Sequence, residues 1–357
     1  METTAAVRPQ PLAARRGQPA AARPAAQARE VWLDRLKGLL ILSVVIGHIL
    51  PGPYNTLDQP AAYLFLFHLP AFFMVSGYLY RESDVPLGRL IAKRARRILV
   101  PYALYLLLIA GSQLAWAALN GYNTRRFWAK KIPALLLGGQ ELNQFYCGAL
   151  WFLTASFTAC ALFYLVEKTA ARLPVRLGIY LAFWAFAHWE AVYLIRGTGP
   201  TPWLWDVGFI GCCYMAMGRY LKPLLFRRWA CAAAAVLLAV LLALRLLGVS
   251  AYLNGFAIEL WSHTHRYPLL DFAVPFAGFV LLANLSRILP ARGLGAALCS
   301  FGRYTIPIMA LHQSVVQVCR AAGIENPLVL WVLAAGIPYL IGRFILENIP
   351  PLRACLL

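Results

Sequence analysis

The sequence predicts an all-α polytopic membrane protein with about ten transmembrane helices. Two observations carry this prediction. Hydrophobic residues make up 61% of the 357 residues, with a mean hydropathy of +0.63, whereas a soluble domain of this length needs far more polar surface. Apolar runs of about 18 residues or more also recur along the chain. Because lipid offers no hydrogen-bond partner to the backbone, these runs are expected to be helices.

The polar stretches between the apolar runs predict the topology. Residues 1–30 are rich in Ala, Pro, Arg and Gln and are expected to be a disordered basic cytoplasmic tail. A membrane domain at 31–348 and a short cytoplasmic tail at 349–357 follow. Lys and Arg number 25 on the N-terminal side of the membrane and 8 on the other side, which predicts cytoplasmic termini. The expected spans are 33–51, 60–80, 98–118, 150–168, 174–195, 202–221, 229–248, 267–286, 303–322 and 326–346.

The net charge of +19 does not indicate a nucleic-acid partner, because the basic residues fall in short clusters between apolar runs. One cluster breaks the charge pattern. The connection 119–149 carries Arg125, Arg126, Lys130 and Lys131 on the predicted outer side. We expect this loop either to contact anionic headgroups or an anionic acceptor, or to form a partly buried re-entrant segment.

The segment DRLKGLLILSVVIGH, residues 34–48, has ionisable side chains at both ends of an apolar helix. Lys37 and His48 are separated by about 1,100° of rotation, within about 20° of three full turns, and by a rise of about 16 Å. Asp34 lies within about 40° of the same face. An ionisable residue inside a span is a candidate functional residue. The alternatives are that His48 only bonds a neighbouring helix and that Lys37 is an interfacial anchor.

The second apolar segment, FLFHLPAFFMVSGYLYR, adds His68, Ser76 and Gly77. His68 is predicted about 18 Å above the inner end of its helix, close to the depth of His48. Two histidines at one level on consecutive helices predict a shared polar site. Gly77 is expected to allow a close approach of another helix.

A basic segment, RLIAKRARRILVP, precedes the third span. Arg94 and Arg97 are one helical turn apart and can face the same anion. Part of this cluster is the positive charge that is ordinary for a cytoplasmic loop. The guanidinium pair also predicts a phosphate site, because the planar guanidinium group can form two parallel hydrogen bonds to phosphate oxygens. Cations at the inner mouth and imidazoles deeper in the membrane fit a coenzyme A thioester, which has a phosphorylated head and a long thin arm.

At these residues the chain resembles the acyltransferase 3 family of integral-membrane acyltransferases, in particular its fucose 4-O-acetylase-like branch. The resemblance covers about residues 30 to 346 and implies ten transmembrane helices, a cytoplasmic acyl-CoA donor and an essential His48. It also implies that Lys37, Arg94 and Arg97 serve the donor, and we group Asp34 with them. Many members have arginine in place of Lys37, so the bidentate contact is lost here. The matching motifs are LDRLKGLLILSVVIGH, FHLPAFFMVSGYLY, KRARRILVPY, LWFL and YTIPIMALHQSVV.

The predicted function is therefore transfer of an acyl group, acetyl by family analogy, from acetyl-CoA to a hydroxyl of a carbohydrate or glycan acceptor at the cell membrane, a bacterial inner or plasma membrane. His48 is the expected general base, and His68, Ser76 or a backbone amide would stabilise the oxyanion. No metal is expected, since the pair His263 and His265 lacks a third ligand. The residues assigned to the acceptor are Trp151, His188, Glu190 and His312. The alternatives are structural pairing for His188 and Glu190, a bridge between helices for His312 and an interfacial position for Trp151.

Two other classes of protein fit the same residues. A transporter or flippase for a small polar or acylated solute would also use intramembrane histidines and a basic mouth. A sensory membrane module would bind a ligand without chemistry. Labelled acyl-CoA separates the first alternative from an enzyme, because a transporter moves its solute unchanged.

Overall fold

The computed structural model describes residues 30–50, 64–194, 201–247, 260, 263 and 265–356. Within these ranges every regular element is a helix and no strand occurs, which confirms the predicted all-α class. Positions 1–29 of the predicted basic tail lie outside the described residues. The predicted spans also extend beyond them at residue 51, residues 60–63, residue 195 and residue 248.

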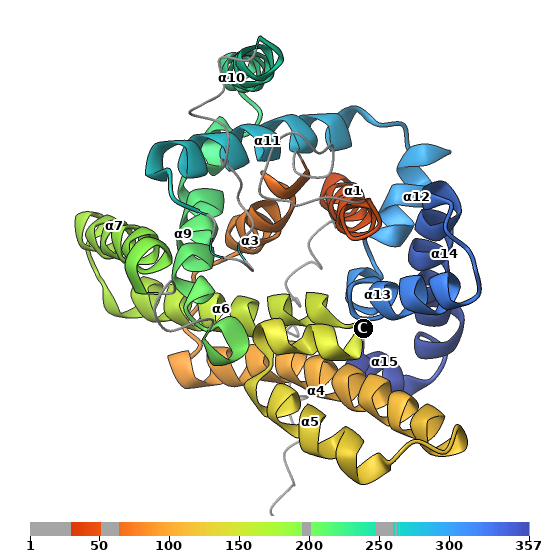
Figure 1. Ribbon diagram of the computed structural model, residues 1–357. Coiled ribbons are helices and arrows are strands. Elements are labelled where there is room, and N and C mark those ends of the chain that lie inside the picture. Colours follow the sequence, from red (N-terminus) through yellow and green to blue (C-terminus); the bar gives the residue numbers. More distant parts are fainter. Residues whose placement is uncertain are drawn as a thin grey trace, which may run out of the picture. The chain divides into compact units, whose positions relative to one another are not determined.

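The helical unit, Val31–Leu357, is shown in Figure 1 with its elements labelled. Their bounds in chain order are α1 Val31–Gly47, α3 His68–Tyr78, α4 Leu87–Leu119, α5 Thr124–Leu137, η1 Gly139–Phe145, η2 Gly148–Leu150, α6 Trp151–Thr169, α7 Leu173–Trp189, η3 Glu190–Leu194, η4 Pro202–Leu204, α9 Val207–Tyr220, η5 Lys222–Leu224, α10 Arg228–Leu246, α11 Pro268–Ile288, α12 Leu294–Phe301, α13 Thr305–Ala321, α14 Pro327–Leu340, η8 Ile341–Leu346 and α15 Pro350–Leu356.

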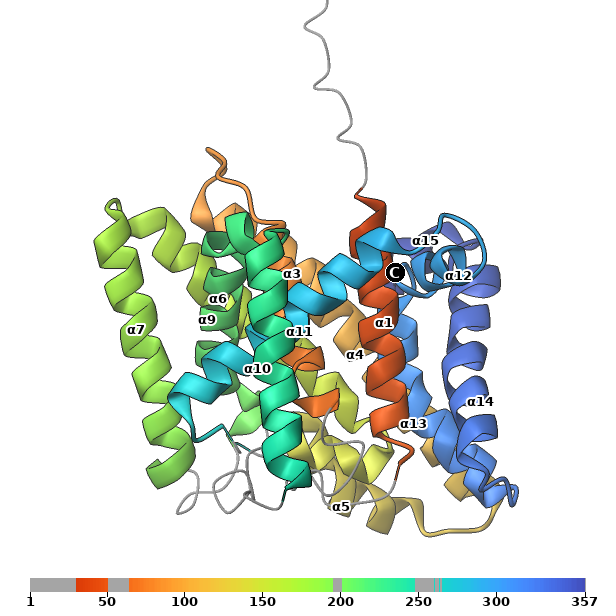
Figure 2. The same cartoon turned by 90° about the horizontal axis from the view of Figure 1, so that it is seen from above.

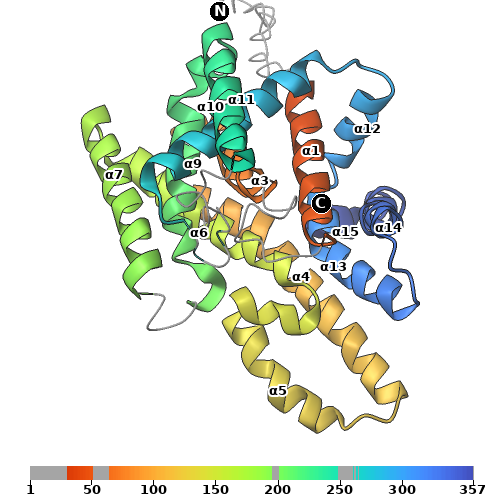
Figure 3. The same cartoon turned by 45° about the horizontal axis from the view of Figure 1, so that its top comes forward.

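Helix α1 is packed among other helices rather than exposed on one side. It contacts α3, α11, α12, α13 and α14, and Figures 1 and 3 show it surrounded by several of these. Its apolar run is correspondingly buried, with Leu36, Leu40 and Val45 fully inaccessible. A helix that is apolar around its whole circumference is expected to lie inside a bundle.

Helix α1 also defines two ends of the helical unit, seen from the side in Figure 2. We call the end at which α1 begins the Val31 face and the end at which it finishes the Gly47 face. The connection from α3 to α4 lies at the Val31 face, whereas α5 lies at the Gly47 face. The segment predicted as the C-terminal tail contains α15, which contacts α4; Tyr105 donates a hydrogen bond to the carbonyl of Leu356 at 3.3 Å.

Among the described residues, four helices are long and apolar enough to cross a membrane, and a fifth span is possible if α12 and α13 are one span bent by 86°. These helices identify a multi-pass membrane protein. Helices α1 and α3 have only 17 and 11 residues, less than the roughly 20 that an untilted span requires. The count of ten spans and the direction of the termini stay predictions.

Helices α3 and α9 approach each other so closely that only glycine fits at their contact. A Cβ atom on Gly77 would lie 1.8 Å from the carbonyl oxygen of Met215, and one on Gly218 would lie 2.0 Å from that of Met74. The obstructing atoms belong to the backbone, so they cannot rotate away. The pair of glycines therefore sets the distance between these helices, as expected for small residues at membrane helix contacts.

We expect Gly77→Ala to destabilise the protein by about 1–3 kcal/mol, the range observed when an added methyl group overpacks an interior. Thermal unfolding in detergent measures this effect. Gly111→Ala is the matched control, because a Cβ on Gly111 meets nothing within 4 Å. Equal melting temperatures for the two variants would contradict the close contact of α3 and α9.

Candidate active site

A cavity of about 290 Å³ contains the two histidines that the sequence places at one depth. We call it the histidine cavity. Its walls come from α1, α3, η1, η2, α6 and α13, so segments far apart in the sequence enclose one small volume. Its polar and aromatic lining includes His48, His68, Phe72, Asn143, Trp151 and Gln313. The structure thus brings His48, His68 and Trp151 together.

The hydrogen bonds around His48 assign its tautomer. His48 Nδ1 lies 2.8 Å from the carbonyl oxygen of Val44 and 3.4 Å from His312 Nε2. His312 Nδ1 lies 2.9 Å from the carbonyl oxygen of Ile308, so it carries a proton and leaves Nε2 as an acceptor. Both neighbours of His48 Nδ1 are therefore acceptors. His48 donates from Nδ1 and keeps the lone pair on Nε2, the form that a general base requires.

His68 has the same tautomer. Its Nδ1 bonds the carbonyl oxygen of Leu64, and its Nε2 is buried with no hydrogen-bond partner among the described residues. The ring packs against Phe65, with centroids 4.8 Å apart. In its neutral form His68 offers the cavity an acceptor and no N–H donor. The arrangement therefore favours a proton-accepting role for His68 over stabilisation of an oxyanion.

A second cavity, of about 180 Å³, lies where the Val31-face ends of α3, α4 and α6 meet. We call it the cation pocket. The basic side chains in its lining are Arg81, Lys93, Arg94 and Arg97, and no carboxylate is among the described residues that line it. Arg94 is oriented by Tyr164, whose hydroxyl oxygen accepts a 2.6 Å hydrogen bond from Nε. The structure thus brings Arg94 and Arg97 together.

Glu82 and Glu167, two acidic residues close to the cation pocket, form ion pairs with arginines that do not line it. Glu167 is buried and forms an ion pair with Arg176 at 2.8 Å. Glu82 pairs with Arg219 at 2.6 Å and with Arg176 at 3.4 Å. The hydrogen bond from Arg219 is the main reason that the pKa of Glu82 falls below its ordinary value. These carboxylates are therefore paired with Arg176 and Arg219 rather than with the cations of the pocket.

Three residues assigned to the catalytic and donor sites from sequence line neither cavity. His312, assigned to the acceptor, also lines neither cavity, although its Nε2 lies 3.4 Å from His48 Nδ1. Lys37 and Asp34 form an ion pair with each other at 3.7 Å on the first turns of α1. Ser76 donates a 3.1 Å hydrogen bond to the carbonyl oxygen of Phe72, one turn earlier in α3. Their proposed contacts with the donor or with the reacting atoms stay predictions.

His188 and Glu190, assigned to the acceptor from sequence, lie away from the histidine cavity. They belong to a buried cluster where α7 ends and α9 and α11 begin. His188 Nε2 lies 3.0 Å from Asp271. Glu190, Asp206 and His263 hold possible metal ligands within 4.8 Å of one another. Asp206 accepts bonds from Thr201 at 2.5 Å and from His263 at 2.7 Å. His263 therefore has two carboxylates beside it that the sequence did not identify as its partners.

Sequence reasoning did not select two amides that line the histidine cavity, Asn143 and Gln313. The side-chain oxygen of Gln313 accepts a 2.9 Å hydrogen bond from the backbone N–H of Ala149. This contact engages the amide oxygen, so the NH₂ group is the part of this cavity-lining side chain that can donate a hydrogen bond. The only sequence signal was that Gln313 follows His312 in the motif ALHQS.

A family model described as an acyltransferase domain matches residues 30–347. The chain is 28% identical over 223 residues to nodulation protein NolL of Sinorhizobium fredii (strain NBRC 101917 / NGR234), covering 58% of this chain and 57% of that protein. It is 35% identical over 83 residues to inner membrane protein YcfT of Escherichia coli (strain K12), covering 18% of this chain and 23% of that protein. The matches therefore span just over half of the length of NolL and about a quarter of the length of YcfT. No solved structure matches the chain.

Proposed function

Because this chain belongs to the acyltransferase 3 family, we propose that it is a membrane O-acyltransferase that moves an acetyl group from acetyl-CoA to a hydroxyl of a carbohydrate acceptor. One observation carries this proposal. The histidine cavity and the cation pocket both contact α3 and α6, one near each end of this helix pair. On α6 the two are separated by about 18 Å, the rise from Phe152 to Tyr164. A donor with an anionic head and a long arm matches this arrangement.

In the proposed topology the Val31 face is cytoplasmic, as the distribution of Lys and Arg suggests. The cation pocket then opens on the side where acyl-CoA is made. Arg94 and Arg97 would hold the phosphates of the nucleotide, for which planar guanidinium groups are suited. The pantetheine arm would extend between the helices toward His48.

The reaction we propose is direct transfer. His48 Nε2 removes the proton from the acceptor hydroxyl while the hydroxyl oxygen attacks the thioester carbon. The new C–O bond forms, the C–S bond breaks, and the thiolate leaves as free CoA after taking the proton from the imidazolium. Val44 and His312 accept from Nδ1 and keep the ring oriented. The NH₂ group of Gln313 is our candidate donor to the oxyanion.

Radiolabelled acetyl-CoA tests the proposal with the full chain in membranes. We expect label to appear on a surface glycan as an alkali-labile ester, together with one free thiol for each ester formed. Glycan mass spectrometry with and without the protein should show the same acetyl group. Movement of an unchanged solute, with no ester and no thiol, would instead identify a transporter and overturn the proposal.

A further inference from the structure

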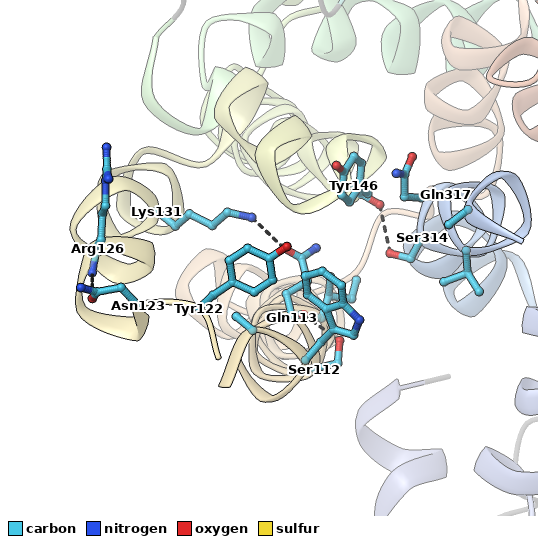
Figure 4. A pocket seen from close by; sticks show the side chains of 14 residues that line it. Ser112, Gln113, Tyr122, Asn123, Arg126, Lys131, Tyr146, Ser314 and Gln317 are labelled. Atoms are coloured by element: carbon cyan, nitrogen blue, oxygen red, sulfur yellow. Dashed lines mark hydrogen bonds between the residues drawn. The ribbon is translucent and has the colours of Figure 1, made fainter. Parts of the chain in front are cut away.

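A cavity of about 850 Å³, larger than the histidine cavity, lies between α4, α5, Tyr146 and the second half of α13 (Figure 4). We call it the α4–α5 pocket. It lies toward the Gly47 face, since α5 is at that face. No residue that lines the cation pocket also lines this pocket. Its size is that of an ordinary small-molecule site.

The lining of this pocket combines aromatic rings with hydrogen-bonding side chains. Trp116 and Tyr122 stack on each other with centroids 5.4 Å apart, and both rings border the pocket. Gln113 and Gln317 add amides from α4 and α13, and Figure 4 shows Gln317 beside Tyr146 at one side. Aromatic faces pack against the C–H faces of sugar rings, while amides bond their hydroxyls. The lining is that of a saccharide site.

The charge of the lining is entirely positive. Lys131 extends from α5 toward α4 in Figure 4, with Nζ 2.8 Å from the side-chain oxygen of Gln113 and 2.7 Å from the carbonyl oxygen of Gln144. Arg126 contributes a second cation from the same helix. Among the described residues that line the pocket there is no Asp or Glu. The two cations therefore favour an anionic group on the ligand.

Consecutive residues of α13 line this pocket and the histidine cavity. Gln313 lines the histidine cavity, and the next residue, Ser314, lines the α4–α5 pocket. Ser314 donates a 3.0 Å hydrogen bond to the carbonyl oxygen of Tyr146, which also borders the pocket. Tyr146 has a left-handed backbone, φ 52°, which is uncommon for a bulky residue and typical of constrained functional segments. A ligand in the pocket thus lies next to the cavity of His48.

The position of these cations has no topological explanation. In the proposed topology the Gly47 face is the outer side, where Lys and Arg are depleted. Arg125, Arg126, Lys130 and Lys131 nevertheless occur together in this segment. Binding of an anion in the α4–α5 pocket accounts for the two of them that line it, Arg126 and Lys131.

We propose that the α4–α5 pocket is the acceptor site and that it selects a saccharide carrying an anionic group. This inference rests on the function proposed above and specifies its substrate class. The sugar ring packs on Trp116 and Tyr122, the anion faces Lys131, and the reactive hydroxyl extends past the contact of Ser314 with Tyr146 into the histidine cavity.

The probes are two sugars of equal size, methyl β-D-glucuronide and methyl β-D-glucoside, which differ in a carboxylate. Their dissociation constants are measured by saturation-transfer NMR with the full chain in nanodiscs. We expect the glucuronide to bind about tenfold more tightly, the effect of a charge-assisted hydrogen bond. Lys131→Gln is expected to remove most of this difference without changing the dissociation constant of the glucoside. Tyr122→Ala is expected to weaken both sugars equally.

Two further variants distinguish a loss of anion binding from a folding defect caused by Lys131→Gln. Arg126→Gln removes a cation at an exposed position and should also reduce the preference for glucuronide. Arg125→Gln removes the same charge from a neighbouring residue that does not line the pocket, and it should leave the preference unchanged. The same set is then assayed for transfer of labelled acetyl to membrane glycan, where Lys131→Gln should lower transfer and leave the dissociation constant of acetyl-CoA unchanged.

Equal affinities for the two sugars, no binding of either, or a preference that persists in both Lys131→Gln and Arg126→Gln would overturn this inference. Those results would leave thioester turnover untouched, so the proposed acyltransferase activity would stand. Selective glucuronide binding without any thioester turnover would confirm the anionic-saccharide site. It would contradict both the proposed acyltransferase function and the role of this pocket as an acceptor site.

Discussion

His48→Ala is expected to lower acyl transfer by about two to four orders of magnitude, the usual contribution of a positioned general base. The reason is geometric. His48 is the imidazole in the histidine cavity whose Nδ1 faces two acceptors, Val44 and His312, so Nε2 is free to take the proton of the acceptor hydroxyl. Removing the ring removes the base and leaves the cation pocket intact. Ester formation from labelled acetyl-CoA measures the effect.

The controls for this variant separate catalysis from folding. The dissociation constant of acetyl-CoA and the elution volume in detergent should both match those of the wild type. His48→Gln, which keeps a polar side chain of similar length, should be as inactive as the alanine variant. Activity within a few fold of wild type in either variant would show that His48 is not the base and would direct attention to His68.

Arg94→Gln and Arg97→Gln are each expected to raise the KM for acetyl-CoA by about tenfold with little change in kcat, because each removes a charge-assisted hydrogen bond to the donor. The two guanidinium groups line one pocket without a carboxylate among its described lining residues. A donor phosphate is therefore their expected partner. Steady-state kinetics with varied acetyl-CoA measures the change.

A truncated donor provides the decisive comparison for these arginines. The acetyl thioester of pantetheine lacks the nucleotide, so its KM should be the same in wild type, Arg94→Gln and Arg97→Gln. Arg96→Gln is the matched control, since Arg96 is exposed on the same helix and lies outside the cation pocket. An equal loss with full and truncated donors would show that the arginines act on the fold and not on the phosphates.

Much of the fold follows from the sequence, because lipid requires apolar segments to be helical whatever surrounds them. The all-α class is of this kind, and so is the burial of α1, whose run from Leu39 to Val45 has little polar character. Gly77 was also selected correctly as a point of close approach, since a missing side chain is visible in the sequence. Helix lengths were less predictable: α3 has 11 residues, although its apolar segment is longer.

The site was only partly predictable, since helical periodicity relates positions on one helix and carries no information about which helices are neighbours. Arg94 and Arg97 could be paired because both are on α4, one turn apart. Lys37 was placed with them by the family resemblance, yet in the structure it pairs with Asp34 and lines neither cavity. His188 and Glu190 were grouped with the acceptor by their depth, and packing places them in a separate buried cluster.

By itself, the sequence determined that this protein is a helical membrane protein of the acyltransferase 3 family, with candidate histidines at one depth and paired arginines at one end of a helix. These properties are local, since they depend on composition, spacing and ordered motifs. The tertiary structure alone decided that His312 contacts His48, that Gln313 lines the histidine cavity, and that the next residue, Ser314, lines an aromatic, cationic pocket. Each of these is a contact between segments distant in the chain, and only the packing of the helices brings such segments together.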